Sequence, residues 1–432
     1  MGTPDWAARL HPGHWHAISG DNPELSLAPT IPGTRYLEDG DPAADPGLNP
    51  NHSLSSSVRR LLGRYVKAPW SGRSHFAAIT EAWNGAVYAS NCGDSGSMVI
   101  FGGGHNDYFG SDVHTFDLAT REWQRVSDGY VTGGSKDYGS GAIYPEGEYP
   151  DGSPLPPHTY GYVQYDEAGN DLLLFKSQLE LGEDVKPLAI PHLFNLSRRE
   201  WRRGPCHPTA YLGAGGWTAW DDRRRILWGN SGDGSDCFLG FSPDGKNPDG
   251  TFGHWRECFA GKLPGSADHC VMAYDPGADQ LVVVDHLRNR LGRLDPRRPS
   301  QPLVYLPSSD DLHLSPYAAL EYSPRLDSLV YYSACNGANI WRIRRESWGP
   351  EREPEPNQTR EWTACHRESL LDPSNRLDPI TDAAQRTRHA INRDHTFGRF
   401  RVASFKEMDL AVLVRHVDTP VYVMRLGEFP VT

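Results

Sequence analysis

Short apolar segments that alternate with polar turns recur along the chain, and this pattern predicts β-hairpins rather than helices. Five segments share the same order of an aromatic residue, a short polar turn and an apolar strand; they are residues 165–175, 220–228, 274–284, 322–332 and 405–414. Residues 83–101 repeat this order with a longer polar insertion around Cys92. Several units continue into a third apolar strand and then a tryptophan, as at Trp123 and Trp201. Units of four strands and about 50 residues, arranged radially, are typical of a β-propeller.

The last apolar strands, residues 411–414 and 421–426, are not followed by a tryptophan strand. We expect an N-terminal strand near residues 14–18 to complete this last blade, because a ring closed by strands from both termini has no exposed edge. The sequence therefore predicts an all-β fold in which residues 1–432 form a single β-propeller domain. Six units can be counted, which leaves six or seven blades. We expect long loops at residues 20–70, 128–157 and 345–388. A seventh unit would have to lie in the first or in the last of these loops.

The composition agrees with many short strands joined by turns. The 432 residues include 44 Gly, 35 Pro and 13 Trp, and 38% are hydrophobic. The net charge of −12 argues against neutralising a phosphate backbone, so we expect no nucleic-acid partner. No apolar run approaches the roughly 20 residues that span a bilayer, so we expect no membrane partner. The first residues lack a secretory signal, so a cytoplasmic location is the default expectation unless a signal has been removed from an exported protein.

Side chains suited to chemistry gather at predicted strand ends in the first two units. These candidate site residues are His75, His105, Asn106, Tyr108, His158, Tyr160 and Lys176. His105 follows a run of three glycines, and Tyr160 precedes the first strand of the next unit. Because the starts of innermost strands and the ends of their partners meet at one mouth of a propeller, we expect these side chains to line one cleft.

This combination of side chains suits one reaction. To eliminate a 4-O-glycoside from a uronic acid, an enzyme must neutralise the carboxylate, remove the C5 proton and protonate the leaving oxygen. Histidine, tyrosine and lysine can perform these three tasks. Hydrolysis is instead expected to need two carboxyl groups at a defined separation. The sequence therefore favours β-elimination, for which no cofactor is required.

The glycine run at residues 102–104, followed by an aromatic residue and then Trp123, resembles kelch repeats. With His75, His105 and Tyr160 in this order, the chain resembles the kelch-type propeller polysaccharide lyases, namely the ulvan lyases and the rhamnose-glucuronate lyases. The resemblance implies a seven-bladed ring and a polysaccharide or oligosaccharide substrate that contains uronic acid.

The resemblance also implies roles for individual residues. His105 and Tyr160 would act as acid and base, and His75, the third catalytic residue, would hold the carboxylate together with Lys176. Lysine stands at 176 where these lyases have arginine, and it cannot grip a carboxylate bidentately, so the choice of substrate stays open. Further substrate contacts are expected from Asn106, Tyr108, His158 and Arg399. For Arg399, the alternative is a structural role in closing the ring.

A metal site is a separate candidate. Seven cysteines, an odd number in a long chain, predict reduced thiols rather than a disulfide framework. One set of cysteine and histidine residues in the third and fourth units suits a structural zinc; it comprises Cys206, His207, Cys237, Cys258 and Cys270. Its spacing is not that of a compact zinc finger, so buried thiols without a metal are the alternative.

Two other functions stay open. Propellers of the kelch type also serve as non-catalytic platforms that bind glycans or proteins, and fold alone does not choose between these roles. A glycoside hydrolase would need a pair of carboxylates in the channel, for which Asp107, Asp112 and Asp236 are the nearest candidates.

Overall fold

The structure is a computed structural model of the 432-residue chain. The residues that it describes are 2–19, 83–102, 111, 113–127, 148, 152–154, 156–175, 189–207, 215–230, 238–256, 270–306, 314–345, 365–386, 396–415 and 419–427. Every structural statement below concerns these residues.

The strands form six antiparallel sheets of four strands each; in five of them the four strands are consecutive along the chain, and the sixth combines the last three strands with the first. Blade 1 comprises β2 (Ala86–Ala89), β3 (Ser97–Ile100), β4 (His114–Asp117) and β5 (Glu122–Arg125). Blade 2 comprises β6 (Val163–Asp166), β7 (Asp171–Leu174), β8 (His192–Asn195) and β9 (Glu200–Arg203). Blade 3 comprises β10 (Trp217–Asp221), β11 (Ile226–Asn230), β12 (Phe238–Lys246) and β13 (Phe252–Arg256).

The second half of the chain repeats the arrangement. Blade 4 comprises β14 (Val271–Asp275), β15 (Gln280–Asp285), β16 (Arg290–Leu294) and β17 (Val304–Tyr305). Blade 5 comprises β18 (Ala319–Ser323), β19 (Ser328–Tyr332), β20 (Ile340–Arg345) and β21 (Cys365–Ser369). Blade 6 comprises β22 (Phe400–Ser404), β23 (Asp409–Val414), β24 (Val421–Leu426) and the N-terminal strand β1 (Trp15–Ala17).

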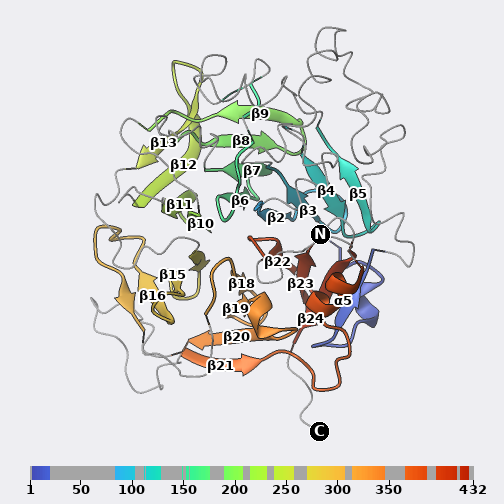
Figure 1. Cartoon of the computed structure of the whole chain (residues 1–432). Helices are drawn as coiled ribbons and strands as arrows, with labels where there is room; N and C mark the ends of the chain where they lie inside the picture. Colours follow the sequence, from blue (N-terminus) through green and yellow to red (C-terminus); the bar gives the residue numbers. More distant parts are fainter. Residues whose placement is uncertain are drawn as a thin grey trace, which may run out of the picture.

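The six sheets surround a common centre, with the first strand of each blade innermost (Figure 1). These innermost strands contact one another in the cyclic order β2, β6, β10, β14, β18, β22 and back to β2. The fold is therefore an all-β, six-bladed propeller. The seventh blade that the resemblance implied has no place in the ring, because six innermost strands already close the cycle among the described residues.

Strand β1 completes the last blade, in the position expected for an N-terminal strand near residues 14–18. It pairs antiparallel with β24, with Trp15 opposite Met424 and Ala17 opposite Tyr422. The Ile18 amide continues the ladder by donating to the Val421 carbonyl at 2.9 Å. Figure 1 shows the N-terminal segment beside β24 and α5. The first and last parts of the chain thus share one sheet, which removes a free edge from the ring.

Both faces of the inner strands are buried because each blade is covered by a neighbour on either side. Every residue of β7, β11, β15 and β23 is buried. The apolar side chains gather between adjacent blades: Val87 of blade 1 packs with Leu172 of blade 2, and Leu410 of blade 6 packs with Met98 of blade 1. Such continuous apolar runs, rather than strict alternation, are what two-sided burial requires.

Three short helical segments accompany the strands in the described part of the chain: η1 (Ala7–Arg9), η2 (Ala334–Asn336) and α5 (Pro379–Arg386). Helix α5 begins where the Asp378 carboxylate accepts a hydrogen bond from the Ile380 amide at 2.9 Å, with proline in the first turn. The expected loop at 345–388 therefore contains strand β21 and this helix. No described helix combines the length and apolar character needed to cross a membrane.

Candidate functional site

The propeller has two ends, which differ in how the chain reaches them. At the strand-start end, the chain enters each innermost strand; at the hairpin end, the innermost strand turns into the second strand of its blade. Of the residues expected to act in catalysis or substrate binding, Tyr160, His158 and Arg399 are described, and all three lie at or near the strand-start end. His75, His105, Asn106, Tyr108 and Lys176 lie outside the described residues.

Tyr160 has a backbone conformation that recurs around this end. Its φ is 40°, and the corresponding residues before β18 and β22, Tyr317 and Phe397, have φ of 54° and 51°. Gly215, before β10, has φ of 69°. Left-handed backbone is uncommon for bulky residues. Its recurrence shows that the chain needs this sharp turn to enter an innermost strand, so strain at Tyr160 is not by itself a sign of catalysis.

Five rings from four blades meet at the strand-start end and form what we call the mouth cluster: Trp83, His158, Tyr160, Tyr317 and Phe397. Trp83 lies 5.0 Å from His158 and 5.9 Å from Tyr160 between ring centroids. Tyr160 stacks on Tyr317 at 6.2 Å, and Trp83 stacks on Phe397 at 6.2 Å. Tyr160 and Phe397 are only 3% exposed, whereas Trp83 and Tyr317 are partly exposed.

His158 and Tyr160 meet edge to face, with ring centroids 5.7 Å apart and an angle of 89° between the planes. The structure therefore brings together the two described residues that the sequence assigned to catalysis and substrate binding in blade 2. It adds Trp83, Tyr317 and Phe397, which sequence reasoning missed. The signal for two of them was available, since an aromatic residue stands two or three positions before both β18 and β22.

One hydrogen bond joins the segment that leads to His105 with the segment that bears Tyr160. The Thr159 hydroxyl donates to the Phe101 carbonyl at 3.2 Å and accepts from the Gly85 amide at 2.8 Å. Phe101 precedes His105 by only four residues, and a chain of four residues spans at most about 14 Å. On the other side, Phe175 immediately precedes Lys176, and its amide donates to the Tyr162 carbonyl at 2.9 Å. The described neighbours of His105 and Lys176 therefore lie beside Tyr160.

Arg399 lies at the seam between the first and last blades. It is 4% exposed, and its guanidinium donates to the carbonyl oxygens of Asn84 at 2.9 Å and Val414 at 3.2 Å. Burial, with a smaller contribution from nearby Arg415, lowers the pKa of Arg399 to about 9. These contacts support the structural alternative raised for Arg399, and its role in substrate binding stays a prediction.

The expected zinc set is only partly described, since Cys237 and Cys258 lie outside the described residues. Cys270 is buried in the apolar core between blades 3 and 4, whereas Cys206 is partly exposed. His207 packs edge to face on Trp255 at 5.1 Å, and burial lowers its pKa. No group of three or more metal-binding side chains occurs within the described segments, so the structural zinc stays a prediction.

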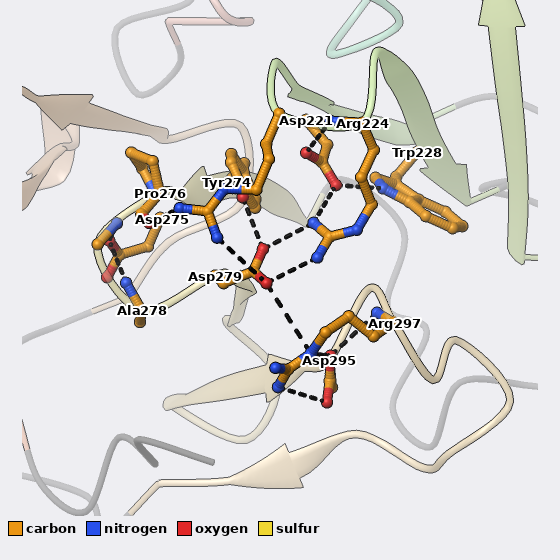
Figure 2. Close-up of polar contacts among 12 residues, drawn as sticks. Asp221, Arg224, Trp228, Tyr274, Asp275, Pro276, Ala278, Asp279, Asp295 and Arg297 are labelled. Atoms are coloured by element: carbon orange, nitrogen blue, oxygen red, sulfur yellow. Dashed lines mark hydrogen bonds and ion pairs between the residues drawn. The ribbon is translucent and has the colours of Figure 1, made fainter.

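A network of charged side chains connects blades 3 and 4 at the hairpin end (Figure 2). The Arg224 guanidinium binds both carboxylate oxygens of Asp279 at 2.6 Å and one oxygen of Asp221 at 2.8 Å. The Tyr274 hydroxyl donates to Asp279 at 2.7 Å. Hydrogen bonds from Arg224 are the main reason why the pKa of Asp279 falls to about 2. Because Arg224 and Arg223 of blade 3 both bind Asp279 of blade 4, the network links these two blades.

Comparison with known proteins adds little to this geometry. No protein-family profile matches the chain. No curated protein matches it either. Structural similarity extends to a chain of a nidogen/laminin complex, at 14% identity over 63% of this chain and 80% of that one, with a TM-score of 0.35. It also extends to a chain of a mitotic checkpoint complex, at 9% identity over 96% and 100%, with a TM-score of 0.39.

A third similar structure is a protein of unknown function from Bacteroides thetaiotaomicron, at 8% identity over 79% of this chain and 69% of that one, with a TM-score of 0.41. Similarity at this level carries no argument about function. The class of the protein therefore follows from its own strand topology, which is that of a six-bladed β-propeller with an aromatic cluster at one mouth.

Proposed function

We propose that this propeller is of the kelch type and is a polysaccharide lyase, which cleaves a uronic-acid-containing glycan by β-elimination at the strand-start end. The observation that carries the proposal is the contact of Thr159 with Phe101, which joins the segments of Tyr160 and His105 across two blades. Tyr160 itself lies among rings from four blades, with His158 at its edge.

The reaction needs only the kinds of groups that the candidate residues supply. A base removes the proton from C5 of the uronate, the C4–O bond breaks, and a double bond forms between C4 and C5. The leaving oxygen takes up a proton from the acid. Tyr160 and His105 supply the acid and the base, and His75 and Lys176 hold the carboxylate, whose stabilisation makes the C5 proton acidic.

A second candidate is a glycan-binding propeller without catalysis. The observation that favours it is the partial exposure of Trp83 and Tyr317 in the mouth cluster. Aromatic faces of this kind offer apolar contact area to the carbon-bound hydrogens of a sugar ring. In this case the mouth would retain a glycan and leave it intact.

One experiment separates these functions. The protein is incubated with uronate-bearing polysaccharides, including ulvan and gum arabic, and the ultraviolet absorbance of the unsaturated product is followed. We expect a steady rise that Tyr160→Phe slows by at least about 100-fold, because acid–base groups contribute about 10²–10⁴-fold to rates.

The matched control is Tyr317→Phe. Tyr317 shares the left-handed backbone of Tyr160 and stacks on it, so its replacement tests the loss of a hydroxyl in the same environment. We expect Tyr317→Phe to keep the rate within a few-fold of the unmodified protein. Equal losses in both variants would contradict the role of Tyr160. Retention of a glycan without any absorbance change would support the binding function and exclude the lyase on that substrate.

A further inference from the structure

A cavity of about 200 Å³ lies in the central channel, and residues from all six innermost strands line it. Its lining includes Gln164, Trp220, Glu321 and Arg401. No lining residue is the first of its strand, and the mouth cluster, which precedes the strands, does not line the cavity, so the cavity lies on the hairpin side of that cluster. It is thus a different location from the one considered for β-elimination.

The channel is partly filled at the strand-start end, where Tyr160 of blade 2 stacks on Tyr317 of blade 5. A Cβ added to Gly85 would overlap the Tyr160 carbonyl oxygen and would lie 3.1 Å from that of Phe397. The backbone segments of three blades therefore touch at this level. The Tyr160 amide donates to the Trp83 carbonyl at 2.9 Å, and the Ala86 amide donates to the Gly398 carbonyl at 3.2 Å. We infer that the cavity is reached from the hairpin end.

Aromatic side chains surround that approach. The second-to-last residue of the innermost strand is aromatic in five blades, and we call this set the collar: Tyr88, Tyr165, Trp220, Tyr274 and Tyr322. In blade 6 the same position is Ala403. Four collar residues are partly exposed, unlike Tyr160 and Phe397 at the other end. Each collar residue thus packs against the core between two blades and also lines the cavity, and four of the five keep part of their surface exposed.

The collar side chains are fixed in place before any ligand arrives. The hydroxyls of Tyr165 and Tyr322 donate to Asn170 at 2.8 Å and Asp327 at 2.7 Å in their own hairpin turns. The Arg225 guanidinium lies 5.9 Å from the Trp220 ring centroid and is itself bound to Asp166 by bonds of 2.7 and 2.8 Å. A fixed aromatic wall reduces the ordering that binding would otherwise require.

Polar groups line the cavity deeper in the channel. Glu321 accepts from Arg401 at 2.5 Å, and Arg401 also donates to the Ala86 carbonyl at 2.6 Å. Gln164 donates to the Thr218 carbonyl at 2.9 Å. Glu321 and Arg401 compensate each other's charge, so a charged ligand would lose its hydration here without gaining a free counter-charge.

We propose that this cavity binds one uncharged pyranose, stacked on the collar and hydrogen-bonded to Glu321 and Gln164. The volume admits a single small ring, the aromatic rings offer faces for its carbon-bound hydrogens, and the planar polar groups offer partners for its hydroxyls. A uronic acid is disfavoured because its carboxylate would lose its hydration beside the Glu321–Arg401 pair without gaining a free counter-charge. The proposal goes beyond the lyase function and does not depend on it.

The test is a titration of the full chain with methyl glucoside, methyl galactoside, methyl xyloside and methyl rhamnoside, followed by ligand-observed NMR. Methyl glucuronoside is the charged comparison. For a ligand of this size we expect saturable binding of at least one neutral sugar with a Kd of about 1–10 mM. We expect Trp220→Ala to raise that Kd about tenfold by removing a stacking face.

Two further variants keep the result interpretable. Trp255→Ala is the matched control, because Trp255 also packs partly buried against the same core cluster as Trp220 but does not line the cavity. It should leave the Kd unchanged. Glu321→Gln keeps the shape of the side chain and should raise the Kd about fivefold, since hydrogen bonds to a charged group are stronger.

Three outcomes would overturn the proposal: no saturable binding of any neutral sugar, equal binding by Trp220→Ala, or glucuronoside binding as tight as that of the neutral sugars. The lyase assay is read separately on the same Trp220→Ala protein. Because Tyr160 lies at the other end of the channel, Trp220→Ala should form the unsaturated product at the same rate as the unmodified protein. Failure of one proposal is therefore distinguishable from failure of the other.

Discussion

At the strand-start end, adjacent blades meet through backbone contacts and stacked rings, whereas at the hairpin end they meet through polar and charged side chains of their turns. Gly85 and Tyr160 illustrate the first kind of contact, and the bidentate Arg224–Asp279 pair illustrates the second. The pairing of turns continues around the ring, as where Asn91 of blade 1 donates to the Glu167 carbonyl of blade 2 at 2.9 Å.

The difference follows from geometry. Where adjacent blades approach as closely as they do at Gly85, an added Cβ would overlap neighbouring backbone, so backbone atoms must fit closely. At the hairpin end, long side chains such as Arg224 and Arg225 fill the space between the turns of adjacent blades, and the cavity lies on this side of the channel. We therefore expect the strand-start end to tolerate added volume poorly and the hairpin end to respond to charge, salt and pH.

The largest effect is expected from Gly85→Ala. The new Cβ would overlap a carbonyl oxygen of the backbone, which cannot move away as a side chain could. We expect a loss of at least about 3 kcal/mol in the free energy of unfolding, measured with urea. The control is Gly161→Ala, whose Cβ would lie 3.3 Å from its nearest neighbour, Trp217, and should cost about 1 kcal/mol or less. Equal losses would show that the convergence at Gly85 is not tight.

A smaller effect is expected at the hairpin end from Asp279→Asn. The substitution weakens the paired bonds from Arg224 and leaves that guanidinium, which is 21% exposed, with only Asp221. We expect a loss of about 2 kcal/mol in the free energy of unfolding. Asp295→Asn is the matched control, because Asp295 pairs with the 45%-exposed Arg297 and should contribute only about 0.5 kcal/mol. Similar values for both variants would contradict a special role for Asp279.

The sequence predicted the hairpins because their pattern is local. The order of aromatic, polar turn and apolar strand at residues 165–175 and 274–284 corresponds to β6–β7 and β14–β15. In blade 6 the pattern is shifted: Phe405 follows β22 and packs on Tyr88 at 6.4 Å, while Ala403 occupies the collar position. Helix α5 was missed although Asp378 and Pro379 are a readable start signal, since a single helix carries little weight in an all-β pattern.

The candidate site was less accessible to sequence reasoning because it combines residues far apart in the chain. Only the closure of the ring brings Tyr317 against Tyr160 and Phe397 against Tyr317 and Trp83. Likewise, the Glu321–Arg401 pair and the collar are set by ring geometry rather than by spacing along the chain. Local patterns thus predict strands and turns. Predicting contacts across the channel also requires the correct number of blades, and the resemblance implied seven.

The smallest effect, and the one that best separates the two ends, is the pH dependence of the Arg224–Asp279 contact. The pKa of Asp279 is lowered from 3.8 to about 2, mainly by its bonds with Arg224. A carboxyl group whose pKa is lower in the folded state stabilises the protein above its unfolded pKa and loses that contribution as the pH falls through the folded value. We therefore expect the stability difference between the unmodified protein and Asp279→Asn to be constant above about pH 5 and to shrink by about 1–2 kcal/mol towards pH 2. Urea unfolding of both proteins at several pH values measures this difference.

Gly85→Ala is the contrast, because a steric overlap does not titrate. The loss of stability in Gly85→Ala should therefore stay constant over the same pH range. A loss that changed with pH in both variants would mean that the two ends are not held together by different forces.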